Sequence, residues 1–341
     1  MAFPTTTRAF RRTSNGKNIE LVTESIPQSL QPTQVLLKIH AVSLNFRDVG
    51  MLHNRYPIPV IPHGVPCSDA SATIISIGSS VTGLAEGNFV APTFRETCSG
   101  EIKALGGDVD GVLREYAIFD QCDITKIPSY LSHEEASTIP CAGVTAWTAL
   151  DFDKKRQGKS ALMQGTGGVS IFATLLCVTT GMAAIITSSS DEKLEKCKEL
   201  GQVVQGINYR THEDWDEEAK RLTQGDGVDV VINNVGITSM EQCFNALARY
   251  GTVSLVGFLG GVEGAEMPDC FTPVLMKAAR VQSGGIFVGT REDQQDLCAF
   301  LAEKKISLKP LVDRVFEFEE SAKAFEYLYS GAHTGKVVIK L

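Results

Sequence analysis

The stretch that decides the fold is Gly165-Thr-Gly-Gly-Val-Ser170. It follows the apolar run Ala161-Leu-Met163, which predicts a buried strand, and it opens an apolar stretch that predicts a helix. A glycine-rich turn between strand and helix approximates the G-x-G-x-x-G/A pattern of dinucleotide-binding turns. Gly165 permits the tight turn, Gly167 lets the backbone approach a pyrophosphate, and Ser170 is small enough for close helix–strand packing.

The first helical turn supplies the anion-binding groups in this interpretation. Thr166, Gly168 and Val169 would present backbone N–H groups, and the helix dipole places partial positive charge at the same end. The alternative is a glycine-rich turn that binds no ligand. The surrounding pattern favours a ligand, because further strand–helix units follow the turn, with strands predicted at 183–187, 228–232 and 253–256.

The end of the second predicted strand bears on the choice of cofactor. It reads Thr187-Ser-Ser-Ser190, where an acidic residue would hold the ribose hydroxyls of NAD. We expect Asp191 to be a helix N-cap with its side chain turned to the backbone. Ser189, Lys193 and Tyr209 would then suit a 2′-phosphate, since hydroxyls donate and an ammonium neutralises. The sequence favours NADPH over NADH; the alternative for Lys193 is a solvated surface lysine.

Length and charge set the remaining limits. The chain has 341 residues, enough for two domains at roughly 100–200 residues each. The first third reads as short strands and turns, which predicts a small β-rich domain. A net charge of −8 argues against a nucleic-acid partner.

No signal peptide or membrane span is evident, so we expect a soluble cytoplasmic protein. The nine scattered cysteines, with no Cys-x-x-Cys pair, predict free thiols.

Several stretches together resemble the medium-chain dehydrogenase/reductase superfamily over essentially the whole chain. They are the Gly165 turn and residues 43–48, 66–70, 105–117, 139–146, 281–289 and 335–339. The combination is similar to the zinc-lacking branch, quinone-oxidoreductase-like or labelled zinc-type alcohol dehydrogenase-like. The implied fold is α/β, with a GroES-like β-rich catalytic domain (1–127 and 270–341) and a Rossmann doubly wound dinucleotide-binding domain (128–269).

The resemblance also implies where a catalytic zinc would be bound in other members. The three ligand positions correspond here to Asn45, Ser68 and Cys141, a poor donor set for zinc. Of the four-cysteine structural lobe only Cys98 remains. His63 is close in sequence to the second ligand position, and the alternative is that it swings in to rescue a metal site. We therefore expect no zinc.

Loss of zinc shapes the expected reaction. Zinc polarises carbonyls and stabilises alkoxides, whereas a quinone or an α,β-unsaturated carbonyl delocalises negative charge by itself. We expect a zinc-independent, NADPH-dependent reduction of an activated C=C bond or a quinone by hydride transfer to a small-molecule substrate. The alternatives are a zinc-free alcohol dehydrogenase or carbonyl reductase of a specialised pathway, and an NADPH-binding protein with a structural or regulatory role.

Further site residues come from the resemblance alone. Asn45 corresponds to an asparagine near the nicotinamide ribose, and Lys336 to a basic residue near the pyrophosphate. The other cofactor positions implied are Thr145, Asn234, Gly257, Phe287 and Val288, the last two on a strand. Each also has a structural alternative as a cap, core or surface residue.

The proton donor and the assembly are the least determined features. Tyr56 is a candidate donor on a proline-rich loop, with packing against the prolines as its alternative. Arg47 could bind an enolate oxygen or pair with Asp48 or Asp69, and water could also be the donor.

We expect a homodimer in which Gln282 to Val288 forms a sheet edge that pairs across a two-fold axis.

Overall fold

The computed structural model describes residues 3–96, 102–151, 159–261, 268–283 and 287–341. They form two compact units, one of residues 1–142 and 290–341 and the other of residues 143–289. No helix in the described ranges is both long and apolar enough to cross a membrane.

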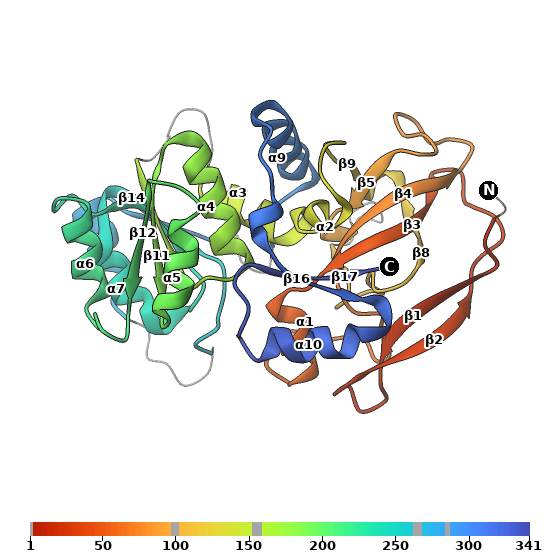
Figure 1. Cartoon of the computed structure of the whole chain (residues 1–341), viewed down its shortest axis with the longest axis horizontal. Coiled ribbons are helices and arrows are strands. Elements are labelled where there is room, and N and C mark those ends of the chain that lie inside the picture. The colour runs from red at the N-terminus through yellow and green to blue at the C-terminus, as the bar shows by residue number, and fades with distance from the viewer. Residues whose placement is uncertain (1–2, 97–101, 152–158, 262–267, 284–286) are drawn as a thin grey trace. The chain divides into compact units, whose positions relative to one another are not determined.

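The second unit is built on a six-stranded parallel sheet (Figure 1). Its strands are β10 (Ser160–Gln164), β11 (Ala183–Ser188), β12 (Val204–Asn208), β13 (Val228–Asn233), β14 (Leu247–Leu255) and β15 (Arg280–Ser283). The order β12-β11-β10-β13-β14-β15 is the Rossmann order, counted 3-2-1-4-5-6 from β10. The direction of winding reverses between β10 and β13, and ligands bind at the carboxyl ends of strands at such a point.

Helices cover both faces of this sheet. In order they are α3 (Val144–Ala149), α4 (Gly168–Thr180), α5 (Asp191–Lys198), α6 (Trp215–Leu222), α7 (Met240–Ala246) and α8 (Phe271–Lys277). Figure 1 shows α4 and α5 on one face and α6 and α7 on the other, as right-handed crossovers in opposite directions require. The core between these layers includes Leu162, Val231 and Phe244, all fully buried.

The first unit contains the β-rich sheet. Its seven strands are β3 (Gln34–Ser43), β4 (Asp69–Ile77), β5 (Phe89–Pro92), β8 (Tyr116–Asp120), β9 (Ile124–Lys126), β16 (Val312–Glu317) and β17 (Lys336–Lys340). Two small pairs accompany it, β1 (Thr6–Arg12) with β2 (Ile19–Ser25) and β6 (Arg95–Glu96) with β7 (Lys103–Ala104). The helices are α1 (Phe46–Leu52), α2 (His133–Ala136), α9 (Arg291–Lys304) and α10 (Ser321–Tyr329). The predicted α/β fold class is confirmed.

The units divide later along the chain than the sequence suggested, at 142/143 and 289/290 rather than 127/128 and 269/270. At the first boundary, α2 packs on β3 and β4, and Tyr130 donates to the carbonyls of Leu301 and Ile306 at 2.8 Å each. At the second, β15 pairs with β14 in the parallel sheet. Tertiary contacts, rather than changes in composition, therefore set both boundaries.

Candidate functional site

The glycine-rich turn adopts the conformation that the sequence predicted. Gly165 has φ +79°, and its N–H donates to the carbonyl of Thr187 at 2.9 Å, which ties the turn to β11. Gly167 is the N-cap of α4 and offers no side chain to the first-turn N–H groups. A Cβ added at Gly165 or Gly167 would meet no atom within 4 Å. The turn therefore leaves open space against free N–H donors, a cradle that fits a pyrophosphate.

Asn234 links the two strands at the switch point, β10 and β13, beside this turn. Its side-chain amide donates to the Gln164 carbonyl at 2.8 Å and to Ser170 Oγ at 3.1 Å, which joins the end of β13 to the turn after β10. A Cβ at Gly257 would lie 2.5 Å from the Asn234 carbonyl oxygen, so glycine is required there. The predicted residues Gly165, Asn234 and Gly257 thus converge at the carboxyl edge of the sheet.

The end of β11 differs from the sequence prediction in one respect. Ser190, not Asp191, is the N-cap of α5, and its Oγ accepts from the Lys193 N–H at 3.3 Å. The Asp191 carboxylate instead accepts from Asn208 Nδ2 at 2.8 Å. The helix begins one residue earlier than expected because the serine hydroxyl competes well for the capping position.

Ser189, Lys193 and Tyr209 lie at the same sheet edge. Tyr209 follows β12, its N–H donates to the Ser188 carbonyl at 3.1 Å, and its side chain is exposed. Lys193 is in the first turn of α5, and Ser189 is half-buried directly before the cap. The three residues assigned to a 2′-phosphate therefore come from adjacent strand ends.

The remaining predicted cofactor residues of this unit, Thr145, Phe287 and Val288, differ in burial and in backbone conformation. Thr145 is buried on α3. Phe287 and Val288 were expected on a strand, but β15 ends at Ser283 and both lie beyond it in a turn. Val288 has φ +55°, and its carbonyl accepts from Thr148 Oγ1 at 2.8 Å. This backbone conformation is incompatible with a strand, and Phe287 is exposed.

In the first unit, Asn45, Ser68 and Cys141 gather around a buried ion pair. Lys336 Nζ donates to Asn45 Oδ1 at 2.7 Å and to the Leu44 carbonyl at 2.6 Å, and lies 3.9 Å from Asp69 Oδ2. Ser68 Oγ donates to Asp69 Oδ1 at 2.7 Å, and the Cys141 N–H donates to Asp69 Oδ2 at 3.2 Å. We call these five residues (Asn45, Ser68, Asp69, Cys141 and Lys336) the lysine cluster.

The chemistry of the lysine cluster does not fit zinc. The side-chain amide oxygen of Asn45 already accepts a hydrogen bond from the Lys336 ammonium, and a second cation beside that ammonium would be repelled. Of the three ligand positions only Cys141 offers a sulfur donor, while Asn45 and Ser68 offer an amide and a hydroxyl, which are poor zinc ligands. Asp69 is fully buried, and burial raises its pKa although Lys336 opposes the shift. Elsewhere in the described residues, no three His, Cys, Asp or Glu side chains form a metal-binding group.

A second charged group lies next to the lysine cluster in the sequence. Asn45 caps α1, and its N–H donates to Asp48 Oδ2 at 2.8 Å. The Arg47 guanidinium donates to the Leu105 carbonyl at 2.7 Å and lies 5.4 Å from the centre of the Tyr56 ring. Burial lowers the pKa of Arg47, but Asp48 and Tyr56 outweigh it, so the pKa is raised and the charge retained. Arg47 therefore brings positive charge to Tyr56.

Sequence reasoning considered Asp69 only as a partner of Arg47 and missed its pairing with Lys336. Lys336 begins the last strand and is 3% exposed, whereas a lysine at a strand end is usually solvated. The cysteine prediction also needs a correction, because Cys122 is in a disulfide, while the other seven described cysteines are free. Cys98 lies outside the described residues.

Comparison with known proteins agrees with the two-domain fold. The alcohol dehydrogenase GroES-like domain family matches residues 31–129, and the family described as zinc-binding dehydrogenase matches residues 168–303. A zinc-type alcohol dehydrogenase-like protein of Schizosaccharomyces pombe is 38% identical, with 93% of each chain covered. A quinone oxidoreductase-like protein 2 homologue of Nematostella vectensis is 26% identical, covering 95% of this chain and 86% of its own length.

Solved structures give the same result. A Sinorhizobium meliloti 1021 protein with a provisional alcohol dehydrogenase name superimposes with a TM-score of 0.87 at 32% identity, covering 99% of this chain and all of its own. The protein belongs to the medium-chain dehydrogenase/reductase superfamily and is a nicotinamide-dependent oxidoreductase with a GroES-like and a Rossmann domain.

Proposed function

We propose that this enzyme is a zinc-independent, NADPH-dependent reductase of an activated C=C bond or a quinone. The observation that carries the proposal is the lysine cluster, in which an ammonium is bonded to the residue at the first zinc-ligand position. NADPH, bound at the glycine-rich turn, would supply the hydride. The chain's own residues would then have to stabilise the negative charge that develops on the acceptor.

Asn45 and Tyr56 are the residues proposed to act on the substrate. The Asn45 amide oxygen is fixed by Lys336, which leaves Nδ2 as the donor. Its protein contacts are Ser68 Oγ, at a long 3.4 Å, and the Asp69 carboxylate. A donor held this way can bond a developing enolate or phenolate oxygen without reorganising. Tyr56 lies against the Arg47 guanidinium, so a phenol hydroxyl and a positive charge are held side by side. The alternative for Tyr56 is a purely structural aromatic.

Cofactor choice is the second part of the proposal. Ser189, Lys193 and Tyr209 would hold the 2′-phosphate of NADPH, and β11 ends in serine where an acidic residue would favour NADH. Thr145, Phe287, Val288 and Lys336 remain proposed cofactor contacts from the family pattern. The two hydrogen bonds of Lys336 inside its own unit favour a positioning role through Asn45.

Reduction of a carbonyl is the second candidate function, because several relatives carry the name alcohol dehydrogenase, including one of Geobacillus stearothermophilus at 27% identity. This reaction would place more negative charge on one oxygen, without the delocalisation that a quinone or enone provides. A non-catalytic NADPH-binding role is the third.

Metal analysis and cofactor titration test the proposal together. The purified protein should hold far less than one zinc per chain, and chelation should leave its NADPH-dependent activity unchanged. NADPH should bind more tightly than NADH in a fluorescence titration. Stoichiometric zinc with activity lost on chelation would contradict the proposal, and tight NADPH binding without turnover on any acceptor would favour the non-catalytic role.

For assembly we propose a cytoplasmic homodimer that pairs through the sheet edge at Gln282 to Val288. β15 is the edge strand, and Val281 in it and Phe287 after it are exposed; residues 284–286 lie outside the described residues. Light scattering should give a dimer mass, and a monomer at working concentration would refute the pairing.

A further inference from the structure

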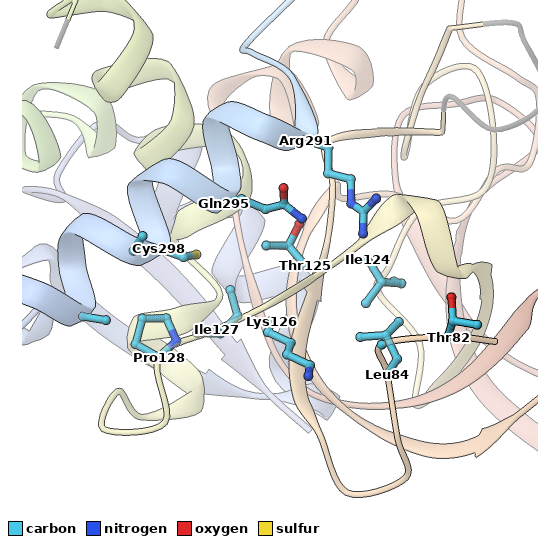
Figure 2. Close-up of a pocket in the computed structure, with 13 residues that line it drawn as sticks. Thr82, Leu84, Ile124, Thr125, Lys126, Ile127, Pro128, Arg291, Gln295 and Cys298 are labelled. Carbon is cyan, nitrogen blue, oxygen red and sulfur yellow. The ribbon is translucent and has the colours of Figure 1, made fainter. Parts of the chain in front are cut away.

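A pocket of about 410 Å³ lies in the first unit, and none of its lining residues belongs to the lysine cluster or the cofactor turn. Figure 2 shows one wall formed by α9 and the other by the segment from Ile124 to Pro128, with Thr82 and Leu84 on an adjacent loop. Pockets of a few hundred Å³ are the size that small ligands occupy.

The α9 wall changes character along its length. Arg291, Gln295, Cys298 and Ala302 line it at spacings of four, three and four residues, which places them on one helix face. The polar members are at the N-terminal end and the apolar ones toward the C-terminal end. The distance from Arg291 to Ala302 along the axis is about 16 Å at 1.5 Å per residue. A ligand lying along this wall would meet a charged end and an apolar end.

The polar end carries positive charge that no lining residue neutralises. Arg291 and Lys126 are the charged residues of the described lining, and no carboxylate is among them. The N-terminus of α9 adds the positive end of its dipole. The first turn of α9 also carries Glu292 and Asp293, but neither lines the pocket, and the Asp293 carboxylate is turned to the cap, where it accepts from the Thr290 N–H at 2.7 Å and from the Thr290 hydroxyl at 3.0 Å.

Two buried donors at this end have no partner in the described structure. Thr125 is 2% exposed and its hydroxyl makes no hydrogen bond, and Arg291 Nε is likewise buried and unpaired. Figure 2 shows Thr125 beneath Gln295, with the Arg291 side chain reaching from α9 toward Ile124. Burying a donor without a hydrogen-bond partner destabilises the protein. An oxyanion can accept hydrogen bonds from both the Thr125 hydroxyl and the Arg291 guanidinium.

The opposite end is apolar. Ile127, Pro128, Ala299 and Ala302 line it together with Cys298, whose thiol stays neutral because burial raises its pKa to about 12. Such a lining suits a hydrocarbon chain and offers nothing to a second charged group.

We infer that this pocket is a binding site for a monocarboxylate with a hydrocarbon tail. Its carboxylate lies between Arg291 and Thr125, and its tail runs along α9 toward Ala302. Inorganic phosphate would neutralise the positive charge but leave the apolar end empty. A neutral alcohol with a hydrocarbon chain would fill the apolar end but leave the positive charge without a counter-ion.

Equilibrium dialysis of the intact protein with octanoate, acetate, octanol and inorganic phosphate tests the assignment. Octanoate should bind saturably at one site per chain and at least about tenfold more tightly than the other three. Arg291→Gln should weaken octanoate binding at least about tenfold and leave the NADPH-dependent activity unchanged. Lys323→Gln, the same charge change on an exposed residue of α10, should leave octanoate binding unchanged.

A second variant covers the case in which Arg291→Gln fails to fold. Ala299 is exposed on α9, so Ala299→Trp can fill the apolar end without disturbing the core, and it should also abolish octanoate binding. Equal binding of octanol would show that the site does not recognise a carboxylate. Equal binding of acetate or phosphate would show that the apolar end does not bind a hydrocarbon tail. Failure of octanoate to bind, or binding that survives both variants, would overturn the site.

Discussion

Lys336 Nζ donates a 2.7 Å hydrogen bond to Asn45 Oδ1 and thereby joins the last strand of the chain to the cap of its first helix. The same ammonium faces Asp69, which is fully buried. A positive charge fixed at the first zinc-ligand position is the structural basis for proposing a reaction that needs no metal.

The first prediction concerns this buried pair. Lys336→Met should lower the free energy of unfolding by about 3–5 kcal/mol, because it leaves the Asp69 carboxylate buried without a counter-charge. Adding Asp69→Asn to that variant should recover a substantial part of the loss. Urea unfolding of the two variants and the wild type measures both effects, and a loss below about 1 kcal/mol in Lys336→Met would contradict the pairing.

The second prediction concerns the glycine-rich turn. Gly167→Ala should weaken NADPH binding at least about tenfold, because its methyl group would project into the space beside the first-turn N–H groups. The protein itself should tolerate it within about 1 kcal/mol, since the new Cβ meets no atom.

Gly181→Ala is the matched control at the other end of α4. Gly181 has φ +73°, so alanine there should cost stability while leaving the cofactor affinity unchanged. NADPH fluorescence titration and thermal unfolding of both variants separate the two effects. Unchanged NADPH affinity in Gly167→Ala would remove the turn from the cofactor site.

Cofactor preference gives the third prediction. Lys193→Ala should weaken NADPH binding about tenfold and leave NADH binding nearly unchanged, because only NADPH carries the 2′-phosphate. Lys196→Ala is the control, since Lys196 is on the same helix with its ammonium 2.8 Å from Glu192. A parallel loss of affinity for both cofactors in Lys193→Ala would count against a 2′-phosphate contact.

The fourth prediction is a pH dependence of stability. Burial, helped by His133 and Lys38, lowers the pKa of His40 from 6.5 to about 4. Its ring centre lies 4.1 Å from that of His133, and its Nε2 is 3.1 Å from Thr73 Oγ1. Between pH 6.5 and 4 the unfolded chain binds a proton that the folded chain excludes, so stability falls as the pH falls through this window.

His40→Gln should therefore lose less stability than the wild type between pH 7.5 and pH 5. The urea midpoint at the two pH values measures this difference. His212→Gln, at an exposed position, should behave as the wild type does. Equal pH dependence in His40→Gln and the wild type would exclude His40 as a source of the effect.

The Rossmann unit could be predicted from sequence because its signals are local. The glycines of the turn, the short apolar strands and the intervening charged helix are each legible within about ten residues, and the sheet order follows from crossover rules. The convergence of Gly165 with Asn234 also follows. Each residue comes directly after one of the two strands, β10 and β13, that flank the switch point.

The resemblance grouped Asn45, Ser68 and Cys141, but the contacts of Lys336 with Asn45 and Asp69 could not be predicted because they are long-range. Asn45 and Lys336 lie 291 positions apart, and only the pairing of β17 with β3 brings their segments together. The N-cap of α5 was misplaced for a different reason, since Ser190 and Asp191 are both good caps and Asn208 decides between them through Asp191. The pocket along α9 likewise depends on helix–strand packing that no local pattern encodes.

Product analysis of NADPH-dependent reduction of a 2-alkenal tests the central claim most directly. The enzyme and NADPH are incubated with the alkenal, and the product is identified by mass and by proton NMR. The expected product is the saturated aldehyde, with the hydride delivered to the β carbon. An allylic alcohol would show that the hydride goes to the carbonyl carbon, and would contradict it.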